Sequence, residues 1–331
     1  MNELPPVDLV YTWVDGSSPV FAARIEKYRK EQAARSKAPT PYGYGPYRFR
    51  DLDNLRFSLR SVAQNASWFR RIFIVTNGQV PRWLRKDAGV EIVTHEQIFE
   101  RPEVLPTFNA CAIETQLHRI PGLGRYFVFM NDDFFFSRPT PKDYFFGKNG
   151  LPRLLLSPEP INPNPNRPNR WYGTLARLAR LMTERFGERI WRVGAHGPAC
   201  FDRDALAAVY ALWPQEIEHA SRNRFRDETD MQLHALYMNT LLALDEQAGK
   251  GEAERHEYAI LEEKELRIIS VGETGKGWRG NLEEVLRDPP RLLCLNDNAP
   301  SELTSAEFAG IEKDHRAFLE AMFSKPSPWE S

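Results

Sequence analysis

A buried strand that ends in neighbouring carboxylates constrains this chain more than any other feature. Residues 126–130 (YFVFM) form a short apolar run typical of a β-strand, and residues 131–133 (NDD) follow it directly. In open α/β sheets, ligands bind where the carboxyl ends of the strands meet. A polar turn that closes a strand is the common alternative, but a second apolar run, 291–295 (RLLCL), ends in residues 296–298 (NDN). The repeated pattern favours a ligand site at one edge of a sheet.

The order of the predicted elements indicates an α/β fold. In the first half of the chain, short apolar runs alternate with segments of helical periodicity. This alternation is typical of a mostly parallel sheet that helices cover on both faces. The predicted strands are 7–13, 71–76, 90–93 and the run before residue 131, and the predicted helices are 21–34, a segment that Asp51 begins and caps, and 109–120.

The second half of the chain is predicted to be more helical. A strand is expected at 151–156 and a helix at 227–244, and a capping box at Thr304–Glu307 precedes a final helix. Residues 41–46 (PYGYGP) are predicted to form a loop. Residues 158–170 are rich in Pro and Asn, which excludes a helix or a central strand and predicts a long loop.

These elements divide the chain into two halves of one integrated domain. Residues 1–157 are predicted to form an α/β half that contains the 131–133 (NDD) motif, and residues 171–331 to form a second half beyond the loop at 158–170. The net charge of −1 gives no reason to expect nucleic acid as a partner. No stretch is long enough for a membrane span, and the N-terminus lacks signal-peptide features. Three widely spaced cysteines predict buried free thiols and a cytoplasmic, reducing compartment.

The chemistry of adjacent carboxylates points to a hard cation. Asp132 and Asp133 suit Mg²⁺ or Mn²⁺, which bind one or two carboxylates and complete their shells with water and substrate phosphates. Asn296 and Asp297 are expected to bring further oxygens to the same cation or to a sugar. The alternative for both pairs is turn capping at a strand end, and for the second pair the two interpretations are equally supported.

Four segments, in order along nearly the whole chain, resemble one family, the Stealth proteins. They are 8–16 (DLVYTWVDG), the long segment 48–133, a third segment with 195–198 (AHGP) and 226–232 (RDETDMQ), and 294–298 (CLNDN). The family includes bacterial capsule-polymer sugar-phosphate transferases. It also includes the catalytic subunit of the lysosomal-enzyme N-acetylglucosamine-1-phosphotransferase. The resemblance implies a Rossmann-like or GT-A-like nucleotide-sugar transferase core, completed by the more helical second half.

The resemblance also implies an activity. A sugar-1-phosphate, such as N-acetylglucosamine-1-phosphate or a similar hexose-1-phosphate, passes from a UDP-sugar to a hydroxyl of a carbohydrate or other acceptor, and UMP leaves. His196 is the expected base, Arg226 the expected phosphate clamp, and Asp133 the third catalytic residue. Asp132, Asp133 and Asp297 are the expected ligands of Mg²⁺ or Mn²⁺.

A further set of polar and aromatic residues is expected to contact the nucleotide or the sugar. For Trp13 the alternative is core packing, and for Asp51 it is a helix N-cap. Glu114 lies near the start of the predicted helix 109–120, where first-turn electrostatics explains a carboxylate as well as a ligand contact does. His118 and His234 are expected to be partly buried structural residues. The expected contact residues are Trp13, Asp15, Arg48, Asp51, Asp53, Arg56, Asn77, Asn109, Asp230 and Asn296.

Two other functions remain open from the sequence. An ordinary glycosyltransferase would use the same strand-end carboxylates but would release UDP instead of UMP. A non-catalytic module that binds a carbohydrate or nucleotide would tolerate the loss of His196 and Arg226, and both are present. The donor base, the sugar, the acceptor and the oligomeric state cannot be read from the sequence, which is also compatible with peripheral membrane association.

Overall fold

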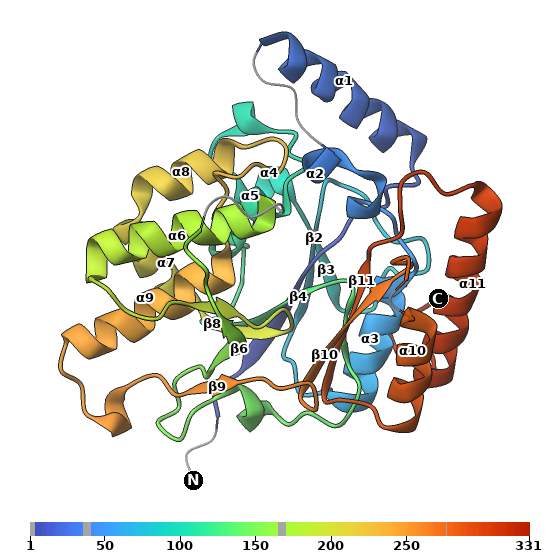
Figure 1. The fold of residues 1–331 in the computed structure, drawn as a ribbon. Coiled ribbons are helices and arrows are strands. Elements are labelled where there is room, and N and C mark those ends of the chain that lie inside the picture. The colour runs from blue at the N-terminus through green and yellow to red at the C-terminus, as the bar shows by residue number, and fades with distance from the viewer. Residues whose placement is uncertain (1–3, 36–40, 165–169, 276) are drawn as a thin grey trace.

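The main sheet lies at the centre of the molecule, with helices on both of its faces (Figure 1). The structure is a computed structural model and describes residues 4–35, 41–164, 170–275 and 277–331. The strand order is β3-β2-β1-β4-β8; the first four strands are parallel and β8 is antiparallel to β4. The predicted mostly parallel α/β fold is therefore confirmed. The strands are β1 (Val7–Thr12), β2 (Ile72–Thr76), β3 (Val90–Thr94), β4 (Tyr126–Asn131) and β8 (Ala199–Asp202).

The two faces of the main sheet carry separate hydrophobic cores. On one face, Val10, Phe73 and Phe127 pack with apolar side chains of helices α6 to α9. On the other face, Leu9 and Ile74 pack with α3. Because both faces are covered, the central strands are continuous apolar runs. The helices are α3 (Asn54–Asn65), α6 (Arg170–Phe186), α7 (Arg203–Leu212), α8 (Pro214–Arg222) and α9 (Leu233–Gln247).

A second sheet, with the order β10-β11-β5, joins the two repeated strand ends. Strand β5 (Phe134–Phe136) follows Asp133 directly and pairs antiparallel with β11 (Leu292–Asp297). Strand β10 (Leu266–Val271) runs parallel to β11. Helices α10 (Trp278–Arg287) and α11 (Ser305–Met322) cover this sheet, and the predicted capping box at Thr304 begins α11. The turn after β4 and the end of β11 are thereby brought together.

A third sheet corrects one prediction about residues 158–170. Strand β6 (Leu154–Pro160) lies between β7 (Arg192–Gly194) and β9 (Tyr258–Ile260), so residues 158–160 form a strand and not a loop. The pairing with β9 ends at Leu156, so the proline-containing end of β6 pairs only with β7. The register between β6 and β7 shifts between Leu156 and Pro160, and this irregularity accommodates residues that cannot donate to a regular ladder. Residues 165–169 of the predicted loop lie outside the described residues.

Several predicted helix boundaries were wrong. Helix α3 begins at Asn54, where Asp53 has a left-handed backbone (φ +64°) and makes no side-chain cap, so Asp51 is not the N-cap. The predicted helix 109–120 is a five-residue helix, α5 (Ala110–Glu114), followed by the 3-10 turn η3 (Leu117–Arg119). Helix α9 begins at Leu233, and residues 227–232 form a non-helical loop. At each of these boundaries a polar side chain bonds to nearby backbone: Asp51 accepts from the Asp53 amide, Thr115 donates to the Ala112 carbonyl, and Asp227 accepts from the Thr229 amide. Such local bonds compete with helical hydrogen bonding.

The remaining helical elements are short, apart from one. Helix α1 (Pro19–Arg35) extends away from the body of the molecule (Figure 1). The predicted loop 41–46 contains the short helix α2 (Pro41–Tyr44). No helix among the described residues is both long and apolar enough to cross a membrane. The other elements are η1 (Pro46–Arg48), α4 (His95–Ile98), η2 (Pro102–Val104), η4 (Lys142–Phe145) and η5 (Glu252–Glu254).

Candidate active site

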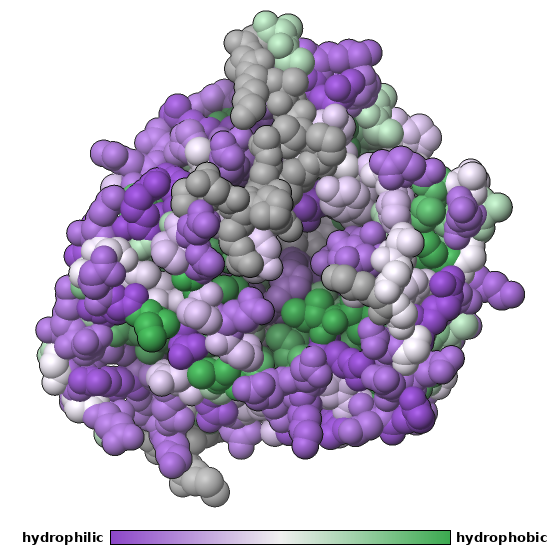
Figure 2. Space-filling model, in the orientation of Figure 1, coloured by the Kyte–Doolittle hydropathy of each residue, from purple (hydrophilic) through white to green (hydrophobic). Residues whose placement is uncertain are grey.

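The face of the molecule viewed in Figure 2 is hollowed near its centre. The Leu295 amide donates to the Asp133 carbonyl at 3.0 Å, so the end of β11 lies beside the turn after β4. Asp132 and Asp133 occupy the turn between β4 and β5, and both side chains are partly exposed. The predicted position of these carboxylates at a sheet edge is confirmed.

The surroundings of the two carboxylates disfavour negative charge. Burial raises the pKa of Asp133 to about 7, and burial followed by repulsion from Asp133 raises the pKa of Asp132 well above its usual range. Asp133 Oδ2 accepts a weak hydrogen bond from the Cys294 thiol at 3.8 Å. Among the described residues, Asp133 Oδ1 is buried without a hydrogen-bond partner. A bound cation would satisfy this oxygen and offset the repulsion between the pair.

The donor set fits a hard divalent cation that shares its shell with a substrate. In the described part of the chain, no three His, Cys, Asp or Glu side chains are grouped so as to hold a metal ion by themselves. Magnesium does not need a group of three protein ligands, because it usually binds one or two carboxylates together with water and substrate phosphates. Asp132 and Asp133 supply that number of carboxylates, so Mg²⁺ or Mn²⁺ stays a prediction that these residues fit.

Asp297, the third predicted metal ligand, is held in an ion pair. Arg50 Nε and Nη2 donate to its two carboxylate oxygens at 2.6 and 2.9 Å, and the Ala299 amide also donates to Oδ1 at 3.0 Å. The Arg50 guanidinium in turn lies over the Phe308 ring, 4.5 Å from its centroid. The structure therefore assigns Asp297 a bidentate partner that the sequence did not reveal, and a metal contact would require this pair to open. Asn296 precedes it in β11 and is partly exposed.

Trp13 and Asp15, two of the residues predicted to contact the nucleotide or the sugar, follow β1. The Trp13 indole N–H donates to Asp51 Oδ2 at 3.2 Å, and the ring is only 8% exposed, so core packing accounts for most of its surface. Burial, followed by repulsion from Asp53, raises the pKa of Asp51 to about 6. Asp15 exchanges two hydrogen bonds with the Gln79 side chain, at 3.0 and 2.9 Å. Trp13 thus positions Asp51 instead of offering an open ring for stacking.

Asn77 and Arg48 lie on the same side of the main sheet as these residues. Asn77 follows β2, where its Oδ1 accepts from the Gln79 amide at 3.3 Å. Arg48 ends the turn η1, and its charge acts on His196. The segment after β1 is held close to this turn, because the Gly16 amide donates to the Phe49 carbonyl at 2.9 Å. A Cβ at Gly16 would lie 2.1 Å from that oxygen, so only glycine fits here.

Asp53 and Arg56 have structural partners instead. Asp53 accepts from Arg316 Nη2 at 3.1 Å, and Arg56 Nε donates to Glu330 at 2.6 Å. Both contacts tie the start of α3 to the C-terminal segment. The described contacts thus give no support to the prediction that these two residues bind nucleotide or sugar.

His196 precedes β8 and is exposed to solvent while dense protein surrounds it, as expected for a side chain in a cleft. Its ring lies edge-on to Phe134, with centroids 5.1 Å apart. Burial, followed by the charges of His234, Arg226 and Arg48, lowers the pKa of His196 to about 4. The imidazole is therefore neutral at pH 7 and can accept a proton. This pKa lies below that of an ordinary histidine, about 6.5.

Arg226 lies in the loop between α8 and α9, and buried polar residues hold this loop. Asp230 is 1% exposed and accepts from Asn109 at 3.0 Å, from Asn223 at 2.7 Å and from the Asp227 amide at 2.9 Å. Asn109 is fully buried, caps α5, and also donates to the Asn223 carbonyl at 3.2 Å. Neither side chain reaches solvent, so their burial gives no support to the prediction that Asn109 and Asp230 contact the nucleotide or the sugar. They position Arg226.

Glu114 is a site residue that the sequence did not distinguish from an ordinary helix residue. Burial raises its pKa to about 7 against the opposing charge of Arg226. Arg226 also lowers the pKa values of Asp133 and Asp230, which places the guanidinium among three acidic groups. The one available signal was a carboxylate beside the apolar face formed by Ile113 and Leu117. His118 and His234 are partly buried, as predicted, and the cysteines are buried and free.

Comparison with known proteins identifies the family. Three regions match Stealth family models: residues 5–33 match conserved region 1, residues 48–154 match conserved region 2, and residues 195–239 match conserved region 3. The chain belongs to the Stealth family. Within this Stealth protein, Asp132 and Asp133 lie in region 2, and His196 and Arg226 lie in region 3.

Curated relatives of this Stealth protein are longer chains. An exopolysaccharide phosphotransferase of Nocardia farcinica is 33% identical over 337 residues, covering 98% of this chain and 61% of the relative. The exopolysaccharide phosphotransferase CpsY of Mycobacterium tuberculosis is 31% identical, covering 98% and 58%. This Stealth protein thus spans about 60% of the length of these relatives.

Similarity to solved structures is low. The galactosyltransferase LgtC aligns with a TM-score of 0.43 and 10% identity, covering 98% of this chain and 99% of the other. Mouse xyloside xylosyltransferase 1 aligns with a TM-score of 0.39 and 11% identity, covering 89% and 99%. Neither likeness is close enough to carry an argument about function.

Proposed function

We propose that this Stealth protein transfers a sugar-1-phosphate from a nucleoside-diphosphate sugar to an acceptor hydroxyl. One observation carries the proposal: a partly exposed carboxylate pair lies at a sheet edge, and the cation Arg226 acts both on Asp133 of this pair and on the neutral His196. Transfer of a phosphoryl group needs charge neutralisation and positioning more than covalent chemistry. The printed names of the relatives, exopolysaccharide phosphotransferases, support the same class of reaction.

The residues divide the reaction between them. The acceptor oxygen forms a bond to the phosphorus attached to the sugar, and the bridging bond from that phosphorus to the nucleotide breaks. His196 takes the acceptor proton, and nucleoside monophosphate leaves with the bonding electrons. Arg226 offsets the charge that develops on the transferred phosphate, through the fork geometry that suits phosphate oxygens. The sugar–oxygen bond stays intact, so the anomeric configuration is retained.

Other residues act by position. A cation bound at Asp132 and Asp133 would neutralise the donor diphosphate. Asp230 and Asn109 hold the loop of Arg226. Glu114 gives Arg226 a nearby carboxylate, so that the guanidinium keeps its place before the donor binds.

Product analysis tests the proposal. The purified protein is incubated with Mg²⁺, a panel of UDP-sugars and a hydroxyl acceptor, and the released nucleotide is separated by anion-exchange chromatography. We expect UMP, together with a phosphodiester product detected by ³¹P resonance and by mass. Release of UDP with a simple glycosidic product would overturn the proposal in favour of an ordinary glycosyltransferase. Asp133→Asn is the matched variant that should release neither nucleotide.

A further inference from the structure

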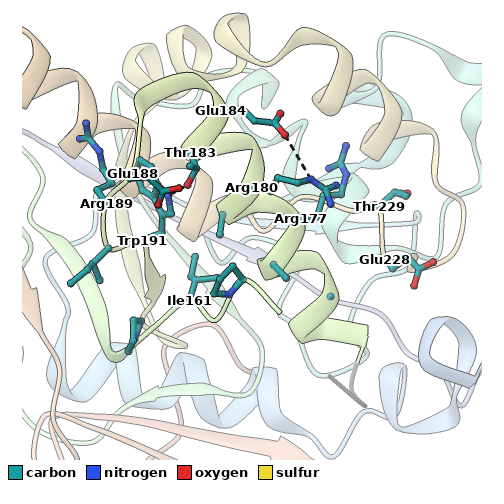
Figure 3. Close-up of a pocket in the computed structure, with 16 residues that line it drawn as sticks. Ile161, Arg177, Arg180, Thr183, Glu184, Glu188, Arg189, Trp191, Glu228 and Thr229 are labelled. Atoms are coloured by element: carbon teal, nitrogen blue, oxygen red, sulfur yellow. Dashed lines mark hydrogen bonds and ion pairs between the residues drawn. The ribbon is translucent and has the colours of Figure 1, made fainter. Parts of the chain in front are cut away.

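A pocket that the mechanism above does not use lies along one face of α6 (Figure 3). Its volume is about 770 Å³, within the usual range for ligand sites. The α6 residues that line it extend from Gly173 to Glu184, a length of about 16 Å at the rise of an α-helix. Ile161 and Trp191 close the opposite wall. The pocket is therefore long enough for an extended chain and not only for a single small group.

One end of this pocket adjoins the loop of Arg226. Glu228 and Thr229 line the pocket, and Figure 3 places them at the same end as Arg177. Because consecutive Cα atoms are about 3.8 Å apart, the Cα atoms of Glu228 and Arg226 lie within about 8 Å of each other. Helix α6 is also bonded to this loop, since Gln232 donates to Thr174 Oγ1 at 3.1 Å. A chain lying in the pocket would thus point one end toward the reacting phosphate.

The charges in the pocket are unevenly neutralised. Arg180 has Glu184 at 4.0 Å, drawn as a dashed line in Figure 3, and Arg189 donates to Glu246 at 2.7 Å. Arg177 instead donates to the thioether sulfur of Met231 at 3.0 Å, and a thioether is a weak, uncharged acceptor.

In the part of the chain that the structure describes, no carboxylate lies within ion-pair distance of the Arg177 guanidinium, although the side chain is half-buried. Burial accordingly lowers the pKa of Arg177. Glu216 and Asp230 act on Arg177 only from beyond ion-pair distance. A partly desolvated cation without an ion-paired carboxylate is a binding position for an anion.

We infer that this pocket binds the acceptor, a carbohydrate chain that carries a phosphate or carboxylate group, with the anion at Arg177. The inference rests on the proposed function, because it assigns the acceptor of the same reaction. The carboxylates of Glu188 and Glu228 also line the pocket. They disfavour a dense polyanion and fit a glycan whose charges are well spaced between neutral sugar units. A phosphodiester-linked product would have this character, so a product chain could return as an acceptor.

Calorimetry without donor tests the inference independently of catalysis. The probes are a mannose oligosaccharide with a single phosphate and the same oligosaccharide after phosphatase treatment. We expect the wild-type protein to bind the phosphorylated form about tenfold more tightly, the size of one charge-assisted contact. Arg177→Gln should bring the ratio of affinities close to one. Arg185→Gln is the matched control, because Arg185 is an exposed arginine of α6 outside the pocket lining.

A second variant guards against misfolding of the first. Gly173→Glu adds a carboxylate to the pocket, and a Cβ at Gly173 meets no atom within 4 Å, so the fold should tolerate it. It should also abolish the preference for the phosphorylated probe. Equal wild-type affinity for the two probes, an unchanged ratio in both variants, or displacement of the probe by UDP would overturn the inference. If no variant or wild-type protein releases UMP, the proposed function fails while the calorimetric result still stands.

Discussion

The buried histidine between α11 and α3 allows a quantitative prediction about acid stability. His315 is fully buried; its Nε2 lies 2.7 Å from Asn54 Oδ1, and among the described residues its Nδ1 has no partner. Burial lowers the pKa of His315 to about 4, against about 6.5 in an unfolded chain. The unfolded state therefore takes up a proton first as the pH falls. Stability that is complete above pH 6.5 is lost as the pH falls toward 4.

The size of this loss follows from the two pKa values. At about 1.4 kcal/mol per pKa unit, His315 alone removes about 2.5 kcal/mol from the free energy of unfolding between pH 7.5 and pH 4.5. His315→Gln keeps a hydrogen-bond donor but cannot titrate. We expect urea unfolding to show that the free energy of unfolding falls less in the variant than in the wild type between pH 7.5 and pH 4.5, by about 2.5 kcal/mol. Lys313→Gln, on the exposed face of α11, is the control and should behave like the wild type.

If acidification destabilises His315→Gln as much as the wild type, titration of His315 does not cause the loss of stability. In that case the imidazole would not be buried in its neutral form. A ring-proton NMR titration of the folded protein gives a second measurement, and a His315 pKa near 6.5 would contradict the packing of α11 on α3.

Three further predictions concern the site and its supports. Asp133→Asn should abolish the Mg²⁺ dependence of UDP-sugar binding in calorimetry, and an unchanged metal dependence would remove Asp133 from the cation site. His196→Ala should lower turnover about 10²- to 10⁴-fold with donor affinity retained. Because the pKa of His196 is about 4, protonation of His196 should lower the kcat/KM of the wild-type enzyme only below about pH 5. A decline in kcat/KM that is centred at pH 6.5 and absent from the alanine variant would contradict this. The Glu330 side chain is 4% exposed and forms ion pairs with Arg56 and Arg60. Its hydrogen bonds lower its pKa to about 2, so the stabilisation that it provides is complete above about pH 4.3 and is lost as the pH falls toward 2. Glu330→Gln should lower the free energy of unfolding by about 1–3 kcal/mol at pH 7, and this difference from the wild type should narrow below pH 4.3. A difference in unfolding free energy that stays constant down to pH 3 would be evidence against the ion pair.

Local patterns in the sequence determined the main sheet and the strand-end carboxylates. Strands buried on both faces must be continuous apolar runs, so β1, β2 and β4 were readable without tertiary information. The capping box at Thr304 was equally readable, because its hydrogen bonds join residues three positions apart. The Asp132–Asp133 pair followed from its place after β4. The order of the four family segments led to the Stealth assignment.

Partners distant in the sequence were decided only by the tertiary structure. Arg50 lies 247 positions from Asp297, and nothing near either residue indicates the ion pair. Asn109 and Asp230 have the polar chemistry of ligand contacts, yet the fold buries both and uses them to hold the Arg226 loop.

The start of α3 and the central position of β6 were also decided by contacts that local propensity does not contain. A residue's chemistry can be read from its type, but its partner depends on which segments pack together. Packing of distant segments also determines burial, and burial is what lowers the pKa of His196 and raises those of Asp132, Asp133 and Glu114.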